Sequence, residues 1–211
     1  MKALLSSTYF GPVQWYQKLA RAEEVYIEQF DAYQKQTYRN RCLIATANGV
    51  QALTVPVEHD DTNSLLSESS SPISIRISDH GNWRHQHWQA LTSAYGDSPF
   101  FQYYVDDLRP FFTERWELLS DFNEAIRVKM CELLDIQPHV LFTQQYQREE
   151  VVKNNGFIDY RETIRPKHAL PDETFLPRRY YQVYEQRHGF LPNLSILDLL
   201  CNMGPESIFY L

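Results

Sequence analysis

The sequence predicts a single α/β domain: a mixed, mostly parallel sheet with an opening βαβ unit, an antiparallel hairpin and flanking helices. Three patterns support this prediction. An apolar run over 3–7, a helical pattern after Gly11-Pro12 and a second apolar run over 25–27 are typical of a βαβ unit. Asn48-Gly49 between β-rich arms indicates a type I′ hairpin, and residues 120–134 have the clearest amphipathic helical pattern.

The remaining elements follow the same periodicities. In the opening unit, Pro12 suits the first helical position and Gly11 its N-cap. Ile73, Ile75 and Ile77 alternate with polar residues, which predicts a half-buried strand. Further elements are expected as helices from residue 82, over the aromatic stretch from 100 to Pro110 and near 194–201, and as a short strand over 140–142.

The length of the chain predicts one domain over residues 1–211. A chain of 211 residues can bury a sizeable core, and two full domains would be unusual at this size. The serine-rich stretch 60–72 is expected to be a mobile loop. The segment 147–179 is charged, contains three prolines and lacks clear periodicity, so we expect it to be irregular and hypothesise that it is a lid over a cleft.

Composition excludes several classes of function. A net charge of -7 argues against a nucleic-acid partner, because phosphate binding needs clustered Lys and Arg. The three cysteines are widely spaced in apolar runs and are expected to be buried thiols of a reducing compartment. No apolar run approaches the ~18 residues of a membrane span, so we expect a cytoplasmic protein.

The first candidate site is the turn from Ser6 to Pro12. A loop that leaves a strand and enters a helix is where open α/β sheets bind ligands, and free N–H groups there favour an anion. We therefore place Ser6, Ser7, Thr8 and Tyr9 among the substrate-binding candidates. No glycine-rich nucleotide motif is present, and the alternative is an ordinary strand exit and helix cap.

The second candidate is the cluster Lys35, Tyr38, Asn40 and Arg41, just before the hairpin. It combines a mobile cation, an aromatic face, an amide and a forked guanidinium, which together suit a carboxylate, a phosphate or a sugar. The alternative is a solvated strand edge on which Lys discourages edge pairing.

The third candidate is His87, which falls on the apolar face of the predicted helix between Trp83 and Leu91. A hydrogen-bonded core histidine and a cleft-facing general base are both open interpretations. His85 and His87 would point in different directions on a helix, and the other histidines lack metal-ligand spacing, so no metal site is predicted.

The closing motif, residues 192–198, is the fourth candidate. Ser195 and Asp198 have the spacing of a helix capping box, and Asn193 in the same motif is placed among the substrate-binding candidates. The chain is also rich in aromatic residues, with 14 tyrosines and 4 tryptophans. Stacking on sugar rings is one explanation, and burial in the core or in a homodimer interface is the commoner one.

The chain resembles the bacterial WbqC-like family over most of its length. The resemblance rests on Thr8-Tyr9-Phe10, Tyr33-x-Lys35-x-x-Tyr38-x-Asn40-Arg41, Tyr95-x-x-Ser98-Pro99-Phe100-Phe101 and the closing Leu191-Pro192-Asn193-Leu194-Ser195-Ile196-Leu197-Asp198. Families of this type are linked with O-antigen gene clusters. The resemblance therefore implies a transferase, including aminoacyl or glycine transfer, that acts on a sugar or nucleotide-sugar precursor in surface-polysaccharide biosynthesis.

On this hypothesis Lys35 and Arg41 bind an anionic donor, Asn40 orients the acceptor and His87 is the general base; Lys35 and His87 are the catalytic candidates. No cofactor is indicated. The family commonly has His-Gln-Pro before the first Tyr, where this chain has Leu5-Ser6-Ser7. That difference motivates the alternative, a non-catalytic binding or scaffold protein derived from such an enzyme. A nucleotidyltransferase is a weaker third hypothesis. Those enzymes usually carry a His motif at the exit of the first strand, and this chain has none there.

Overall fold

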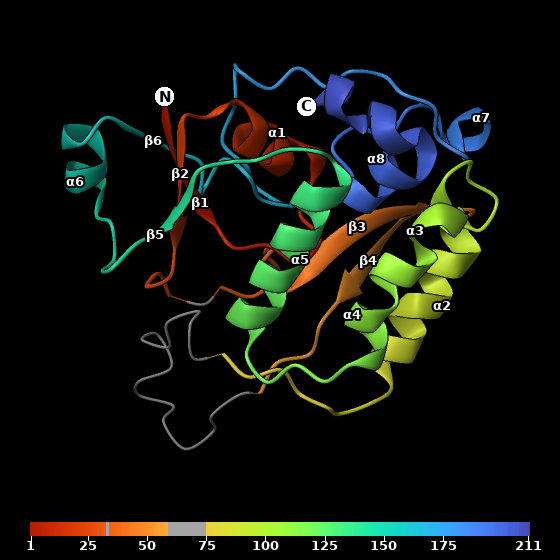
Figure 1. The fold of residues 1–211 in the computed structure, drawn as a ribbon. Helices are drawn as coiled ribbons and strands as arrows, with labels where there is room; N and C mark the ends of the chain where they lie inside the picture. Colours follow the sequence, from red (N-terminus) through yellow and green to blue (C-terminus); the bar gives the residue numbers. More distant parts are fainter. Residues whose placement is uncertain (33, 59–74) are drawn as a thin grey trace.

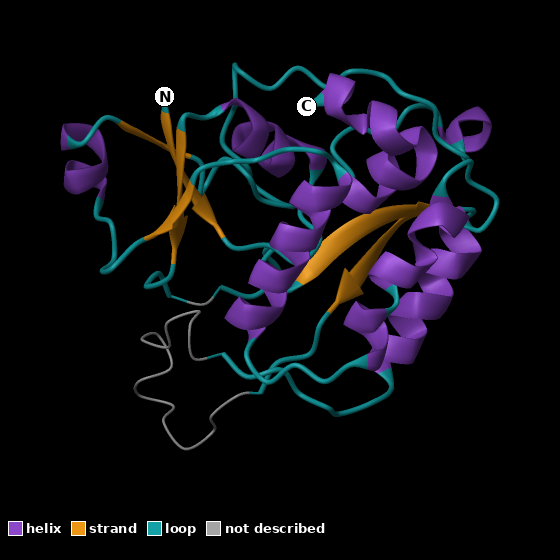
Figure 2. Ribbon diagram, viewed as in Figure 1, coloured by secondary structure: helices purple, strands orange, loops and turns teal. Residues whose placement is uncertain are grey.

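The computed structural model describes residues 1–32, 34–58 and 75–211 of the chain. Within these ranges the strands form two separate sheets, one of four strands and one of two, with helices packed around and between them (Figure 2). The predicted loop over 60–72, the first two residues of the strand predicted at 73–77 and Tyr33 lie outside the described residues.

The four-stranded sheet is parallel throughout. Strand β1 (Lys2–Ser6) pairs with β2 (Glu24–Glu28) on one side and with β6 (Phe157–Asp159) on the other. Strand β5 (Val140–Phe142) extends the sheet beyond β2, so the order is β5-β2-β1-β6 (Figure 1). The predicted α/β class and the opening βαβ unit are confirmed.

Helix α1 (Val13–Arg21) connects β1 to β2 and starts one residue later than expected, because Pro12 occupies the N-cap position that we predicted for Gly11. Gly11 is needed for another reason. A Cβ at this position would lie 2.4 Å from Thr8 Oγ1, closer than any side chain could approach. The turn after β1 can therefore close tightly only with glycine at residue 11.

The segment 147–179 differs from the irregular structure that we expected. It contains helix α6 (Glu149–Asn154) and strand β6, the fourth strand of the parallel sheet. Strand β6 has only three residues, too few to show an alternating pattern, and its register comes from pairing Lys2–Leu4 of β1 with Phe157–Asp159. Local sequence could not show this pairing, because the partner lies more than 150 residues away. The proposed lid function of the segment stays a prediction.

The hairpin consists of β3 (Arg41–Thr46) and β4 (Gly49–Thr54) and forms a sheet of its own. Its turn is not type I′ as predicted. Ala47 and Asn48 are the two loop residues, and neither has a positive φ, whereas Gly49 has a φ of 104°. This combination is typical of a type I turn followed by a glycine bulge. An Asn-Gly pair is compatible with that turn as well as with type I′.

The helices surround the hairpin and fill the space between it and the parallel sheet (Figure 1). Helix α5 (Leu119–Leu133) matches the predicted amphipathic helix, and the aromatic stretch is divided at Arg109 into two helices. Of the strand predicted at 73–77, Arg76 and Ile77 form isolated bridges to Leu118 and Val57. The helical elements are α2 (Trp83–Tyr95), α3 (Phe101–Leu108), α4 (Pro110–Thr113), α5 (Leu119–Leu133), α7 (Glu185–His188), α8 (Ile196–Met203) and a 3-10 helix (Gly204–Tyr210).

Many of the aromatic residues form the core. Tyr9, Phe10, Phe111 and Phe122 pack with ring centroids 5.0 to 6.2 Å apart. Core burial therefore accounts for much of the aromatic content. In the part of the chain that the structure describes, no helix has both the length and the apolar character needed to cross a membrane.

A buried ion pair fixes the chain after β6 against α1. Lys18 Nζ lies 2.7 Å from Asp172 Oδ2, and both side chains are buried. Gln14 Nε2 donates to the same carboxylate (2.8 Å), Thr174 Oγ1 donates to its other oxygen (2.7 Å), and Lys18 Nζ lies 4.7 Å from the ring centroid of Tyr160. Burial alone would raise the pKa of Asp172, but the hydrogen bonds from Lys18, Thr174 and Gln14 outweigh it and lower the pKa to about 2.

The substitution Asp172→Asn is expected to lower the free energy of unfolding at pH 7 by about 3 kcal/mol, because it leaves the Lys18 ammonium buried without a counter-ion. The folded pKa of Asp172 lies below that of the unfolded chain, about 4. The stabilisation is thus complete above about pH 4 and is lost as the pH falls through about 2. Urea unfolding at several pH values tests this, with the exposed neighbour Glu173→Gln as control. If Asp172→Asn lowers the free energy of unfolding no more than Glu173→Gln does, Asp172 is not a stabilising counter-ion of Lys18.

Candidate functional site

The carboxyl ends of the parallel strands meet at one edge of the sheet, and polar residues gather there. The chain leaves β1 towards β2 on one side and later returns to β6 on the other side of β1. The gap between β1 and β6 is therefore the point where the strand order reverses. Open α/β sheets bind ligands outside the carboxyl ends of the strands at this point.

Glu28, the last residue of β2, joins the loops that follow three strands. Its Oε1 accepts from Phe30 N (2.9 Å) and Thr143 Oγ1 (2.8 Å), and its Oε2 accepts from Gln147 N (2.9 Å) and Arg161 Nη1 (3.1 Å). The side chain of Glu28 is fully buried, and that of Arg161 is nearly so. One carboxylate thus fixes the chain after β2, after β5 and after β6.

Arg161 uses its other donors within the same edge. Nε donates to Asp159 Oδ1 (3.0 Å) and Nη2 to Asp159 Oδ2 (2.6 Å), and Nη2 also donates to the carbonyl oxygen of Gln147 (2.9 Å). The guanidinium lies 5.1 Å from the ring centroid of Tyr146. Arg161 is therefore held rigidly, and its bonds orient Asp159 and Tyr146 around the edge of the sheet.

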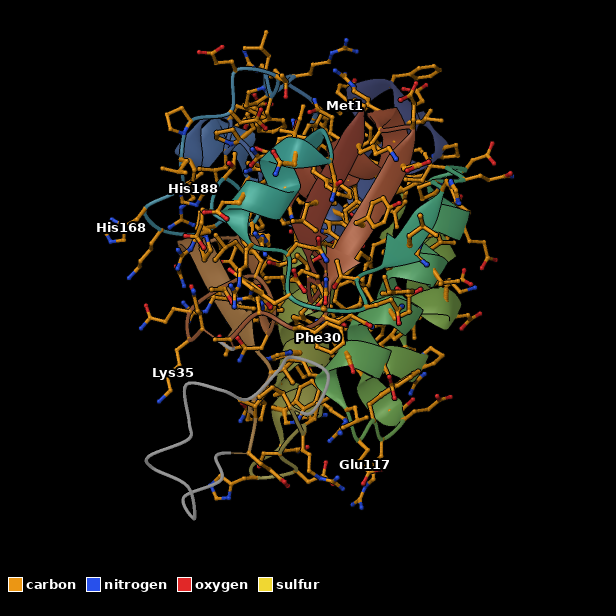
Figure 3. All side chains as sticks on the ribbon, turned by 90° about the vertical axis from the view of Figure 1, so that its left-hand side faces the viewer. Met1, Phe30, Lys35, Glu117, His168 and His188 are labelled. Atoms are coloured by element: carbon orange, nitrogen blue, oxygen red, sulfur yellow. The ribbon has the colours of Figure 1, made fainter. Side chains whose placement is uncertain are left out.

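A cavity of about 460 Å³ opens beside this network. Two of its walls are aromatic side chains that remain partly exposed, Phe30 (38%) and Tyr146 (49%). Figure 3 shows Phe30 near the centre of this face of the molecule. We call the cavity the Phe30–Tyr146 pocket; its lining is Phe30, Asp31, Ala32, Gln34, Tyr146, Asp159, Arg161 and Glu162.

Two narrow cavities lie next to it at the exit of β1, with volumes of about 20 and 10 Å³. Each has room for no more than about one water molecule. Both are lined by Ser7, Thr8 and Trp15, and the second also by Ser6 and Tyr38. The structure thus brings four predicted binding residues, Ser6, Ser7, Thr8 and Tyr38, to the carboxyl edge of the sheet.

An ion pair between Arg39 and Asp31 separates the second narrow cavity from the larger pocket. Arg39 Nη2 donates to Asp31 Oδ2 and to Ser6 Oγ, the latter at 3.1 Å. Burial lowers the pKa of Arg39 to about 10, which still leaves the guanidinium charged at neutral pH. Arg39 lines the narrow cavity, and Asp31 lines the Phe30–Tyr146 pocket.

The other residues of the second predicted cluster lie elsewhere. Lys35 is exposed and projects away from the molecule in Figure 3. Asn40 Nδ2 donates to the carbonyl oxygen of Val55 (2.8 Å), and Arg41 Nε donates to Thr54 Oγ1 (3.1 Å) on the hairpin. None of these three side chains lines the pockets described above.

His87 and Tyr9 form a pair inside the core. Tyr9 Oη and His87 Nδ1 are 2.9 Å apart, both residues are buried, and the ring of Trp83 packs against His87. Burial lowers the pKa of His87 to about 4, although a hydrogen bond with the Thr54 backbone opposes the shift. This geometry is that of the hydrogen-bonded core histidine, the first of the two interpretations; the roles of His87 in catalysis and of Tyr9 in binding stay predictions.

Asn193 and Ser195 hold the start of α1 against α8. Asn193 Oδ1 accepts from Gln14 N (2.9 Å), while Ser195 Oγ donates to the carbonyl oxygen of Phe10 (2.7 Å) and accepts from Leu197 N (3.3 Å). Ser195 is therefore an N-cap as expected. Asp198 does not complete a capping box, because its Oδ2 accepts from Tyr180 Oη (2.7 Å) instead.

Comparison with known proteins gives the family of this chain. The WbqC-like protein family matches residues 7–210, nearly the whole sequence. The chain belongs to the WbqC-like protein family. It is also similar to the uncharacterized protein Rv1507c of Mycobacterium tuberculosis, with 26% identity over an alignment of length 228 that covers 99% of this chain and 96% of that protein. No solved structure gives a significant match.

In this WbqC-like protein, sequence reasoning missed most of the residues that build the Phe30–Tyr146 pocket. Phe30 and Asp31 follow the predicted strand at 25–27, so the exit of that strand was an available signal. Asp159 and Arg161 follow β6, which was not predicted. Tyr146 follows β5 by four residues and is placed by the bond from Gln147 N to Glu28.

The substitution Glu28→Gln is expected to lower the free energy of unfolding by about 3 kcal/mol, since an amide NH₂ would face buried donors and the charge opposite Arg161 would be lost. Glu24→Gln, at the other end of the same strand, is the matched control. Its partner Lys2 is about half exposed, so the cost should be much smaller than that of Glu28→Gln. Equal losses in urea unfolding would show that Glu28 has no special role.

The WbqC-like protein is expected to lose stability as the pH falls from about 6.5 to about 4, because His87 takes up a proton in the unfolded chain and stays neutral in the folded one. The loss from this group is on the order of 3 kcal/mol. His87→Gln should flatten the profile over this range, whereas the exposed His80→Gln should leave it unchanged. The free energy of unfolding is measured against pH by urea unfolding for the parent protein and both variants. If all three lose stability equally over this pH range, His87 is not the group responsible.

Proposed function

We propose that this WbqC-like protein is a transferase that acts on a sugar or nucleotide-sugar precursor of a surface polysaccharide, which it binds in the Phe30–Tyr146 pocket. The observation that supports this proposal is the position and lining of the pocket. It lies at the carboxyl edge of a parallel sheet, beside the reversal of strand order, and has two exposed aromatic walls. A volume of about 460 Å³ is in the range of small-molecule sites.

The chemistry of the lining suits a sugar. Phe30 and Tyr146 offer apolar ring faces on which the C–H face of a sugar ring can stack. Asp159 and Glu162 offer carboxylate oxygens, and the amide of Gln34 can both donate and accept. Sugar hydroxyls donate and accept hydrogen bonds, so this mixture of flat apolar walls and acceptors matches both faces of the ligand.

An anionic donor group would lie at the wall that the Phe30–Tyr146 pocket shares with the second narrow cavity, because that cavity itself has room for only about one water molecule. The residues around the narrow cavity include Arg39, Arg161, Arg165, Ser6 and Thr8. Arginine and hydroxyl groups together favour phosphate oxygens. This placement differs from the sequence-based hypothesis, in which Lys35 and Arg41 hold the donor.

A non-catalytic binding protein is the second candidate, and one observation favours it. At the exit of β1, where the family commonly carries His-Gln-Pro, the two cavities that the described residues Ser7 and Thr8 line are water-sized. A site closed at this point could hold a sugar in the adjacent pocket without reacting with it. An assay for nucleotide release from a bound nucleotide-sugar separates the two candidates. A transferase would release the nucleotide, whereas a non-catalytic binding protein would leave the nucleotide-sugar intact.

A nucleotide-sugar panel is expected to contain at least one compound that raises the melting temperature of the protein. Phe30→Ala and Tyr146→Ala should each weaken that compound's binding roughly tenfold in isothermal titration, because each removes one stacking face. Tyr103→Ala is the matched control, since Tyr103 is 69% exposed on α3 and lines none of these cavities. Equal binding by all variants would remove the pocket from the proposal.

A further inference from the structure

We infer that a second cavity, at the turn of the β3–β4 hairpin, binds an uncharged saccharide. The cavity has a volume of about 340 Å³, within the range of small-molecule sites. We call it the hairpin pocket; its polar lining comes from Asn48 and Gln51 of the hairpin, Gln89 and Ser93 of α2 and Tyr184 at the start of α7. The inference goes beyond the proposed function, because it needs neither the Phe30–Tyr146 pocket nor a reaction.

Hydrogen bonds tie the three walls of the hairpin pocket together. His188 Nε2 donates to the carbonyl oxygens of Thr46 (3.1 Å) and Ala47 (3.2 Å), which joins α7 to the hairpin turn. Tyr184 Oη donates to the carbonyl oxygen of Ser93 (3.2 Å), which joins the start of α7 to α2. Figure 1 shows the hairpin turn and α7 on the right-hand side, away from the parallel sheet. The walls are fixed without a ligand, so little ordering opposes binding.

The stretch that carries Tyr184 is also anchored in the core. Gln182 is buried, and its Nε2 donates to the carbonyl oxygen of Leu191 (2.9 Å) and to Asp198 Oδ2 (2.9 Å). Its Oε1 accepts from Leu191 N (2.9 Å). Tyr184 therefore lies between two fixed points, Gln182 in the core and His188 on the hairpin. Its ring is a stable wall of the hairpin pocket.

Three amide side chains meet in the hairpin pocket with their hydrogen-bonding groups free. The side chains of Asn48, Gln51 and Gln89 are exposed and have no hydrogen-bond partner among the described residues. Each amide offers two N–H donors and one carbonyl acceptor. Neighbouring hydroxyls of a sugar ring also donate and accept, so an amide can bond two of them at once. The three amides therefore match a ligand rich in hydroxyl groups.

The charge of the lining favours an uncharged ligand. No Asp, Glu, Lys or Arg of the described residues lines the hairpin pocket. A phosphate or carboxylate would lose water there without gaining a counter-ion, whereas a hydroxyl brings no charge to compensate. The Tyr184 ring and three alanines supply apolar surface for the C–H face of a sugar ring. An uncharged saccharide satisfies both the amides and this surface.

NMR titration of isotope-labelled protein with maltotriose, cellotriose and N,N′-diacetylchitobiose tests the inference. We expect at least one of them, at up to about 10 mM, to shift the backbone amide signals of residues 46–51, 89–94 and 184. Gln89→Ala should weaken that saccharide's binding about fivefold, the loss expected for one neutral hydrogen bond. Gln86→Ala is the matched control and should not change the affinity, because Gln86 is exposed on the same helix and lies outside the lining.

Three results would overturn the inference: no shift at these residues with any of the saccharides, equal affinities of Gln89→Ala and Gln86→Ala, or shifts there with the uncharged peptide N-acetyl-alanyl-alanine amide alone. Phe30→Ala separates the inference from the proposed function. It should leave saccharide binding at the hairpin pocket unchanged while it weakens nucleotide-sugar binding at the sheet edge. Saccharide shifts confined to the Phe30–Tyr146 pocket would overturn the inference and leave the proposed function standing.

Discussion

The buried carboxylate of Glu28 is the constraint on which the site depends. A charge removed from water must be compensated, and here four donors from the chain after β2, β5 and β6 supply that compensation. Because the donors are fixed, the residues next to them are fixed as well. Phe30 bonds to Glu28 directly, Asp159 bonds to Arg161, and Tyr146 is placed by the bond of its neighbour Gln147 to Glu28. A three-residue strand such as β6 has little packing of its own, so this network also helps to hold it in the sheet.

Buried ion pairs also fix two segments that lack regular structure. Lys18 and Asp172 hold the chain that follows β6, and Arg39 and Asp31 hold the stretch before the hairpin. Such pairs add little net stability compared with an apolar contact, but breaking one leaves a buried charge unpaired. These pairs therefore select one arrangement of the irregular segments over other arrangements that would be equally compact. The pocket benefits because a rigid wall needs no ordering when a ligand binds.

The sequence showed those parts of the fold that local periodicity determines. The βαβ unit, the hairpin arms, helix α5 and the Ser195 cap all follow from spacing within a short stretch of chain. Strand β6 could not be found in this way, because three residues show no period and their partner is β1. The turn type was wrong because Asn-Gly serves two hairpin geometries, and only the φ angles distinguish them. For the candidate site, topology alone placed Ser6, Ser7 and Thr8 at the carboxyl end of the first strand, whereas Tyr38 was predicted only as part of the cluster before the hairpin. Tyr146 and Arg161 could not be placed from the sequence, because hydrogen bonds from Gln147 and Arg161 to Glu28 bring them there across large sequence distances.

The central claim is that the ligand site lies at the carboxyl edge of the parallel sheet. Its most direct test is a map of backbone amide chemical-shift changes while a nucleotide-sugar that raises the melting temperature is titrated into labelled protein. The account predicts that the largest changes fall on residues 30–34, 146 and 159–162, around the Phe30–Tyr146 pocket. The hairpin pocket, lined in part by Asn48, Gln51 and Gln89, lies between the hairpin turn and α2. Changes confined to that pocket would contradict the account.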